Sequence, residues 1–333
     1  MKKQSLLSRF GVHGVLAIVV VWSVLPFLWT FQTSIKFTRD VASKTPVLWG
    51  YETTANAYNA FWLDDDEINM WAVLGYIVGV ALIAVVVGQV GRRARVGWPF
   101  YLGVVAILAL AINVFPRLFE VEDEYRFFVN SLIVTVLTVL ISISIGLLAG
   151  YGLARYTGIS GVVILIVALG FRALPRTAFV LPYYFTAQRL GILDSRLVIV
   201  MALVAVNQPF TIWMLRTFFM DVPREMEEAA MMDGATRFQA FYRVIIPMMW
   251  PGIIATALFT MLLAYNEFLF VRVLAPTNWT LPVAIVSLTG GESSRTITEA
   301  AAASVSITLP IIVVIILFQK HLVKGLGAGA VKG

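Results

Sequence analysis

Few side chains in this 333-residue chain could carry out covalent or metal chemistry. Cysteine is absent, and the two histidines, His13 and His321, lie near opposite ends of the sequence. The composition therefore excludes disulfides, thiolate metal ligands and cysteine nucleophiles, and it argues against a histidine metal cluster or a Ser-His-Asp triad. We accordingly expect no catalytic residue, no bound cofactor and no metal site in this chain.

A polar pair inside an apolar segment is more informative. Asn266 and Glu267 lie between two aromatic residues, Tyr265 and Phe268. Polar and charged groups are costly in lipid and usually face a cavity or a partner, and aromatic faces are surfaces on which sugars stack. These four residues are therefore candidates for a substrate pathway. The alternative is that Glu267 reaches water at a membrane surface, because sixteen residues of helix after Pro251 span about 24 Å.

The polar segment 221–252 is the second candidate region. Pro223 suits the first turn of a helix with Asp221 as its cap, and Gly234 suits a left-handed turn where that helix ends. A second helix is expected from Thr236 onward, where apolar residues recur at helical spacing. This helix–turn–helix is either a docking surface for a partner or an amphipathic connector that lies on lipid headgroups.

The elements that hold these residues are membrane helices, as the composition indicates. Hydrophobic residues make up 59% of the chain and charged residues 13%, and the mean hydropathy is +0.86. Soluble domains have about 25% charged residues, so this chain has too few polar residues to cover the surface of a soluble globular protein. It is also too apolar to be disordered. The net charge of +6 does not indicate a nucleic-acid partner, because membrane proteins gain basic residues in their cytoplasmic loops. We expect an all-α integral membrane protein, a polytopic helical bundle.

Eight segments are apolar enough to cross a bilayer, which takes about 20 residues of helix. The first segment follows Lys2, Lys3 and Arg9 but lacks a small-residue cleavage site, so we interpret it as a retained helix rather than a signal peptide. The expected spans are residues 12–31, 70–90, 97–115, 127–150, 161–185, 197–219, 250–271 and 301–318.

Basic residues indicate the orientation of these spans. With the N-terminus inside, the inner segments hold fourteen Lys and Arg residues and the clearly outer segments hold seven. The positive-inside rule therefore favours cytoplasmic positions for both termini and for segment 220–249. The acidic clusters at 64–67 and 120–124 then face outward.

Segment 220–249 resembles the EAA loop of the permeases of ATP-binding-cassette (ABC) importers. The family pattern is E-A-A, three residues, G, nine residues and then I-x-L-P, and this chain matches every spacing. Val244 replaces the first Ile and Ile246 replaces Leu, and both changes are mild. The resemblance implies that contact with an ATPase involves Glu228, Ala229, Ala230, Asp233, Gly234, Ile246 and Pro247.

Further segments resemble carbohydrate importers, in particular the smaller permease subunit of the maltose type. They are residues 130–131, 151–155, 265–270, in which Tyr265 replaces a tryptophan, 280–283 and the tail 325–333. The resemblance covers 127–333 well, the first span more weakly and 70–115 not at all. We therefore expect a six-helix type I importer core at 127–333. The part at 1–126 would hold the first span, an outer loop and an extra transmembrane hairpin.

The resemblance implies half of the translocation pathway of an ATP-driven, binding-protein-dependent carbohydrate importer in a bacterial or archaeal cytoplasmic membrane. The partners implied are a second permease, two ATPase subunits, an extracytoplasmic binding protein and membrane lipid. The chain has no G-x-x-x-x-G-K-[ST] phosphate loop, so ATP and Mg would be bound, and ATP hydrolysed, by a partner. In this family the EAA loop transmits ATPase closure to the spans.

Two other functions remain as alternatives. An importer of the same class could carry glycerol phosphate, phosphate or an amino acid, although the Asn-Glu-Phe stretch and the Val-Lys-Gly tail favour carbohydrate. An ion-coupled secondary transporter usually has inverted repeats, which this sequence lacks.

Overall fold

The computed structural model describes residues 6–45, 47–63, 70–93, 98–156, 158–289 and 294–330. The acidic cluster 64–67, Arg95 and the last three residues of the tail lie outside this part of the chain. The described chain is helical and holds two isolated β-bridges. The helices are α1 (Leu6–Ser34), α2 (Thr38–Val41), α3 (Asn56–Trp62), α4 (Met70–Arg93), α5 (Trp98–Leu118), α6 (Asp123–Arg155), α7 (Ile159–Arg172), α8 (Arg176–Arg189), α9 (Arg196–Asp221), α10 (Arg224–Met232), α11 (Arg237–Ala240), a π-helical turn (Phe241–Ile245), α12 (Ile246–Met248), α13 (Trp250–Tyr265), α14 (Leu269–Leu274), α15 (Leu281–Thr289) and α16 (Ser294–Ala330).

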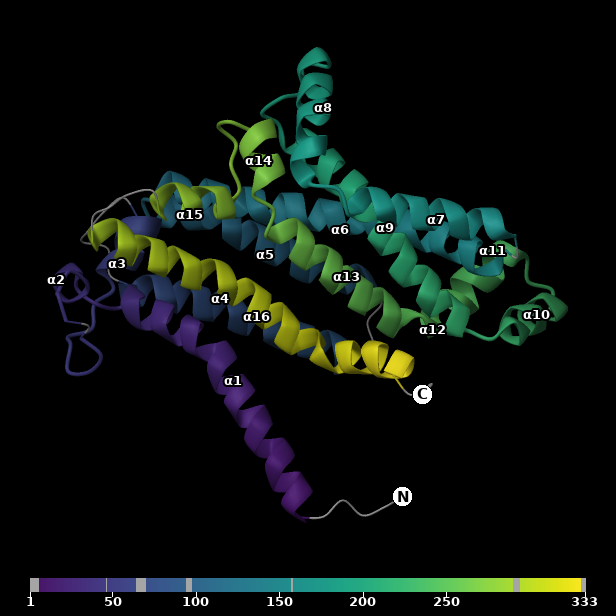
Figure 1. Ribbon diagram of the computed structural model, residues 1–333, viewed down its shortest axis with the longest axis horizontal. Coiled ribbons are helices and arrows are strands. Elements are labelled where there is room, and N and C mark those ends of the chain that lie inside the picture. Colours follow the sequence, from purple (N-terminus) through teal and green to yellow (C-terminus); the bar gives the residue numbers. More distant parts are fainter. Residues whose placement is uncertain are drawn as a thin grey trace. The chain divides into compact units, whose positions relative to one another are not determined.

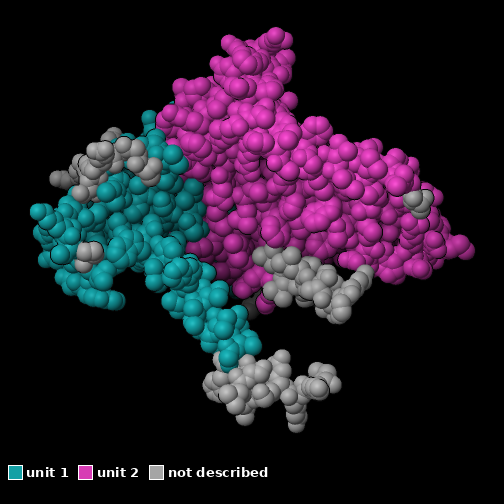
Figure 2. All heavy atoms as spheres, in the orientation of Figure 1, with its two compact units in different colours: residues 1–126, 285–308 teal, residues 127–284, 309–333 magenta. Residues whose placement is uncertain are grey.

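The chain divides into two compact units (Figure 2). Unit 1 comprises residues 1–126 and 285–308, and unit 2 comprises residues 127–284 and 309–333. Residue 127, the start expected for the permease core, is the first residue of unit 2, and the division into an N-terminal part and a permease core stays a prediction. The expected division into two continuous parts did not anticipate that residues 285–308 group with the N-terminal segment.

Each expected span falls on a helix or on a pair of helices. In the described residues, four helices are long and apolar enough to cross a membrane, or six if each of two bent pairs counts as one span. The hairpin helices α4 and α5 have 24 and 21 residues, but their described apolar stretches, 72–87 and 105–118, are shorter. Large apolar side chains are exposed along these helices, as a lipid-facing surface requires.

Two expected spans are broken rather than continuous. In the fifth expected span, α7 ends at Arg172 and α8 starts at Arg176, and the angle of the bend between the two helices is 93°. Pro175 precedes α8 and explains the break, because proline has no N–H for a helical hydrogen bond. Figure 1 shows α8 projecting from α7, with α14 beside it. The seventh span ends at Tyr265 instead of 271.

Close backbone approach joins α6 to α9 within unit 2. A Cβ atom added to Gly150 would lie 3.0 Å from the backbone nitrogen of Arg216, and one added to Gly146 would lie 2.9 Å from the Leu215 side chain. Small residues four apart let membrane helices pack closely. A buried hydrogen bond of 3.1 Å between the hydroxyls of Thr211 and Thr260 adds α13 to this packing.

The N-terminal hairpin packs on itself within unit 1. The Tyr76 hydroxyl on α4 donates to the Ala111 carbonyl on α5 at 2.8 Å. The rings of Tyr76 on α4 and Phe115 on α5 are also in contact, with centroids 5.6 Å apart. Helices α4 and α5 thus form the extra hairpin that the sequence predicts.

Candidate functional site

The EAA-like loop, residues 220–249, folds as the predicted helix–turn–helix. Helix α10 runs over Arg224–Met232, and Gly234 follows with φ +86°, so the left-handed turn is confirmed. The prediction of the N-cap was wrong. Pro223 occupies that position without a side-chain cap, because the helix starts one residue after it and leaves Asp221 too early to cap.

The second helix of the loop begins at a reciprocal cap. The Thr236 hydroxyl accepts from the Gln239 backbone at 3.2 Å, and the Gln239 side chain accepts from the Thr236 backbone at 2.9 Å. A π-helical turn over Phe241–Ile245 follows. Pro247 has no N–H for the carbonyl four residues earlier, which explains why the α-helical pattern is interrupted here. Phe241 and Ile245 are buried in a cluster with Phe219 of α9, which anchors the loop.

Glu227 attaches α10 to the membrane helices, and sequence reasoning missed it. Its side chain is buried, with Oε2 accepting from Arg155 Nε at 3.1 Å and Oε1 accepting from the Tyr151 hydroxyl. Arg155 also donates to the carbonyls of Phe219 at 3.4 Å and Val222 at 3.3 Å, at the end of α9. The i, i+4 spacing of Tyr151 and Arg155 was the available signal, since it places both on one face of a helix.

The predicted ATPase-contact residues lie on α10, in the turn after it and on α12. Glu228, Ala229, Asp233, Gly234 and Pro247 are exposed. Ala230 and Ile246 are half-buried. Exposed apolar groups accompany them, with Met232 87% and Phe238 70% exposed. The loop is thus fixed on one side by Glu227 and open on the other, as a docking surface requires, and its role in ATPase contact remains a prediction.

Glu267, in the second candidate region, links the starts of α8 and α14. It is 3% exposed, and its Oε1 accepts from the backbone N–H groups of Leu269 at 3.1 Å and Phe270 at 3.3 Å, which caps α14. Its Oε2 accepts from Arg176 Nη1 at the start of α8. This contact joins two helix starts and gives the buried carboxylate a cationic partner within an apolar segment.

The other three residues of this region do not gather around Glu267. Asn266 is exposed and donates to the Leu262 carbonyl of its own helix at 2.9 Å. Tyr265 is 4% exposed, and Phe268 packs against the core of unit 2. Asn266 is therefore the polar group of this set that a solute could reach.

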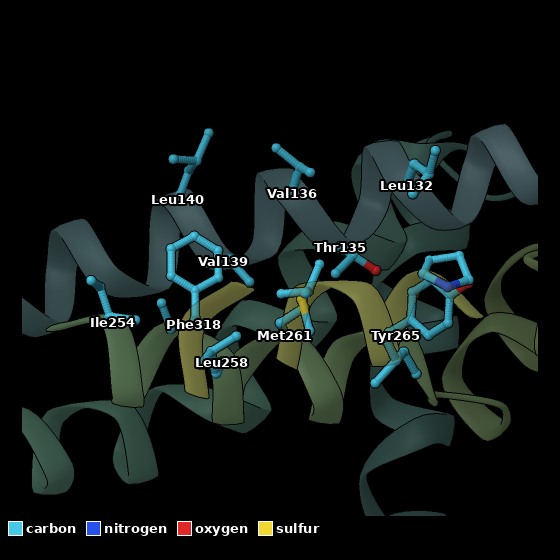
Figure 3. Close-up of a pocket in the computed structure, with 14 residues that line it drawn as sticks. Leu132, Thr135, Val136, Val139, Leu140, Ile254, Leu258, Met261, Tyr265 and Phe318 are labelled. Atoms are coloured by element: carbon cyan, nitrogen blue, oxygen red, sulfur yellow. The ribbon is translucent and has the colours of Figure 1, made fainter. Parts of the chain in front are cut away.

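Tyr265 lines a cavity of about 340 Å³ between α6, α13 and the second half of α16. Figure 3 shows Val139, Leu258 and Met261 between the helices, with Thr135 and Tyr265 toward one end. The hydroxyls of Thr135 and Tyr265 are buried without hydrogen-bond partners among the described residues. The other lining residues are apolar, so this cavity suits apolar groups rather than a sugar.

A polar network in unit 2 fixes the loop before α15. Asn130 donates to the Trp279 carbonyl at 2.9 Å and accepts from Arg196 Nε at 2.7 Å. The adjacent Ser131 hydroxyl accepts from the Leu281 backbone at 2.8 Å. Segments 130–131 and 280–283, which the sequence indicated separately, therefore meet in space.

Asp194, in the turn before α9, also fixes the loop before α15. It has φ +58°, and its Oδ1 accepts from the backbone N–H groups of Thr277 and Asn278, each at 2.9 Å. Partial burial would raise the pKa of Asp194, but the hydrogen bonds from Thr277 and Asn278 outweigh it and lower that pKa. The carboxylate thus acts as a charged cap for the loop.

Neither candidate region presents a set of groups for covalent chemistry. In the part of the chain that the structure describes, no three His, Cys, Asp or Glu side chains are arranged to hold a metal ion. The geometry instead provides a loop with an exposed face and an exposed polar residue, Asn266, in a helical chain.

Known proteins are similar to this chain in sequence and in fold. The chain is 34% identical over 208 residues to the trehalose transport system permease protein SugB of Mycobacterium tuberculosis, covering 62% of this chain and 76% of that protein. It is 28% identical over 341 residues to the diacetylchitobiose uptake system permease protein DasC of Streptomyces coelicolor, covering 99% and 100%. A crystal structure of a bacterial ABC transporter involved in the import of the acidic polysaccharide alginate has a chain with TM-score 0.65, 20% identity and coverage of 96% and 99%.

A family model extends this similarity to nearly the whole chain. The model describes the binding-protein-dependent transport system inner membrane component, and it matches residues 6–327. The match is wider than the resemblance of 127–333 that the motifs indicated, since it extends through the first span and the hairpin segment. The chain therefore belongs to the family of binding-protein-dependent transport system inner membrane components.

Proposed function

We propose that this chain is a permease subunit of an ATP-driven carbohydrate importer, and that its EAA-like loop couples the membrane helices to a separate ATPase. The observation that carries the proposal is the geometry of α10. Glu227 binds it to α6 on one side, while Glu228, Ala229 and Gly234 are exposed on the other. Small exposed residues allow a partner to approach closely, and Met232 adapts to the partner's surface.

The substrate class is proposed from the relatives. The names of two relatives specify trehalose and diacetylchitobiose, and both are disaccharides. We propose Asn266 as a substrate contact, with Tyr265 and Phe268 as neighbours and Glu267 holding the region in place. An importer for glycerol phosphate or an amino acid is the competing proposal.

The assembly that follows has several chains. A second permease would complete the pathway, two ATPase subunits would bind ATP and Mg, and a binding protein would deliver substrate from outside. The chain would lie in a bacterial or archaeal cytoplasmic membrane with both termini in the cytoplasm. ATP and the loaded binding protein would both favour the outward-open state, which makes hydrolysis depend on substrate. Residues 127–333 would form the permease core, and 1–126 would add the first span, outer loop and hairpin.

Purification of the complex tests this function. We expect an ATPase, a second permease and a binding protein to co-purify with the tagged chain. The binding protein is then screened by thermal shift against disaccharides, polyols, glycerol phosphate and amino acids. A ligand at 100 times its Kd stabilises its protein by about 2.7 kcal/mol, so a true substrate is readily detected. Stabilisation by amino acids or glycerol phosphate alone would reject the carbohydrate assignment, and absence of an ATPase would reject the coupling assignment.

A further inference from the structure

A polar cavity of about 400 Å³ lies within unit 1, whereas the residues of both candidate regions belong to unit 2. Thr38 of α2, Asn56 and Asn59 of α3, and Thr298 and Glu299 of α16 line it, together with two alanines. Its size falls in the range of small-molecule sites, which is about 300–1,000 Å³. Its lining is mostly polar, whereas the cavity beside Tyr265 has a mostly apolar lining.

One residue that lines this cavity, Asn59, carries a buried acceptor without a partner among the described residues. Thr298 is 3% and Ala57 5% exposed, so the cavity extends to a buried floor. The Asn59 Oδ1 atom is buried and accepts no hydrogen bond from any described residue. Buried carbonyl oxygens are nearly always paired, so a donor on a bound molecule would complete the hydrogen bonding of this atom.

Hydrogen bonds hold the surrounding elements in place without a ligand. The Thr54 backbone donates to the Ile35 carbonyl at 2.9 Å, and the hydroxyls of Ser34 and Tyr58 are 2.8 Å apart. Trp62 Nε1 donates to the Ser306 hydroxyl at 3.0 Å, which ties the end of α3 to α16. The cavity is therefore formed in advance, which reduces the entropic cost of binding.

The lining selects the chemistry of the occupant. Amides and hydroxyls dominate, Glu299 adds a carboxylate, and none of the described lining residues is basic. An anionic ligand would lack a positive partner, whereas a hydroxyl can donate to Asn59 and Glu299 and accept from an amide or a threonine. Neutral polyhydroxylated molecules match this pattern.

We propose that this cavity is a binding site for a neutral carbohydrate, separate from the translocation pathway. The choice of carbohydrate as ligand rests on the proposed function, and so does the extracytoplasmic location. With the proposed orientation, the site lies on the side from which substrate arrives. Such a site would hold a sugar next to the membrane surface of the importer.

Ligand-observed NMR on the purified permease complex in nanodiscs, without binding protein, tests the site. The probes are trehalose and maltose, with galacturonate as an anionic comparison. We expect saturation transfer to the neutral disaccharides and little to galacturonate. Asn59→Leu should weaken disaccharide binding at least about tenfold, the effect of 1.4 kcal/mol. Asn113→Leu is the matched control, because Asn113 is an exposed asparagine of unit 1 that does not line the cavity.

A second variant distinguishes loss of the binding site from a folding defect. Ala60→Phe fills the cavity without altering a polar group and should also abolish binding. Absence of disaccharide binding in the wild type, or binding retained in either folded variant, would overturn the proposal, and the cavity would then hold only water. Uptake with saturating binding protein is measured in parallel. Binding at this site without uptake would refute the proposed function alone, and uptake without binding would refute this inference alone.

Discussion

Arg155, the last residue of α6, donates from Nε to Oε2 of Glu227 on α10 at 3.1 Å. The same guanidinium also binds the carbonyls of Phe219 and Val222, where α9 ends. One arginine thus connects the exposed helix of the EAA-like loop to two membrane helices. A displacement of α10 cannot occur without moving α6 and α9 or breaking a charge-assisted hydrogen bond.

Loss of the Glu227 carboxylate should uncouple hydrolysis from transport. Glu227→Ala leaves the exposed face of α10 intact, so we expect the ATPase to co-purify and hydrolyse ATP. Uptake should fall strongly, because motion of α10 no longer reaches α6. Removal of a hydrogen bond between charged groups costs about 1.5–3 kcal/mol, so the melting temperature should also fall.

Glu225→Ala is the matched control for this prediction. Glu225 is exposed on the same helix, and removal of its carboxylate should leave uptake and the melting temperature close to the wild-type values. In a double-mutant cycle, Arg155→Ala and Glu227→Ala should be non-additive. Additive losses, or normal uptake in Glu227→Ala, would rule out the mechanical link.

The contrast between Gly234 and Glu227 explains how far the sequence predicts this site. Gly234 and Thr236 are local signals, since a left-handed turn and a helix start depend on neighbouring residues, and the turn at Gly234 and the helix start near Thr236 were correctly predicted. The burial of Glu227 depends on Tyr151 and Arg155, which are 76 and 72 residues away in sequence. Composition and periodicity contain no such pairing, so Glu228 drew attention and its buried neighbour did not.

The membrane helices show the same limit. Hydropathy located every expected span on helical structure, because apolar length is a local property. It did not reveal the bend between α7 and α8, or the end of α13 at Tyr265. Glu267 and Arg176 stabilise both breaks by a contact across 91 residues, which only the folded chain displays.

Substitution of Gly234 should separate backbone strain from side-chain effects. At φ +86°, a residue with a Cβ atom costs roughly 1–2 kcal/mol. We expect Gly234→Ala to weaken ATPase association in a pull-down and to reduce uptake. Gly234→Asn should be milder, because asparagine tolerates left-handed backbone. Gly152→Ala is the control, since a Cβ atom there meets nothing within 4 Å. Equal association for all three variants would exclude Gly234 from the contact.

Asn266 and Glu267 should behave differently although they are adjacent. Asn266→Ala removes an exposed amide that donates to a carbonyl of its own helix. Uptake should therefore fall, while the free energy of unfolding stays within about 0.5 kcal/mol of the wild-type value. Glu267→Gln weakens the ion pair with Arg176, so it should lower the melting temperature. Normal uptake of several sugars by Asn266→Ala would assign this residue to packing instead.

The proposed orientation can be tested with single cysteines, because the chain has none of its own. Lys44→Cys should react with an impermeant thiol reagent in intact cells, since Lys44 lies in the segment expected outside. Arg93→Cys, at the end of α4, should react only after the membrane is opened. Labelling of Arg93→Cys in intact cells would contradict a cytoplasmic turn for the hairpin.

Asp194 should make stability depend on pH in the acid range. Its pKa is lowered in the folded protein because hydrogen bonds from Thr277 and Asn278 outweigh partial burial. The folded state therefore binds fewer protons than the unfolded state, in which aspartate has a pKa of about 3.9. The carboxylate contributes its stabilisation above that value and loses it as the pH falls through the lower folded pKa.

Asp194→Asn isolates this contribution, because asparagine has a similar shape and tolerates the φ of +58° at this position. Its side-chain oxygen can still accept from the backbone of Thr277 and Asn278, but without a charge. We expect the wild type to melt above the variant at pH 6, and the difference to shrink steadily as the pH falls below about 4. Melting of both proteins in detergent across pH 6 to 3 provides the measurement. Two curves that stay parallel over this range would show that the charge of Asp194 does not stabilise the loop, and that its hydrogen-bonding shape alone is sufficient.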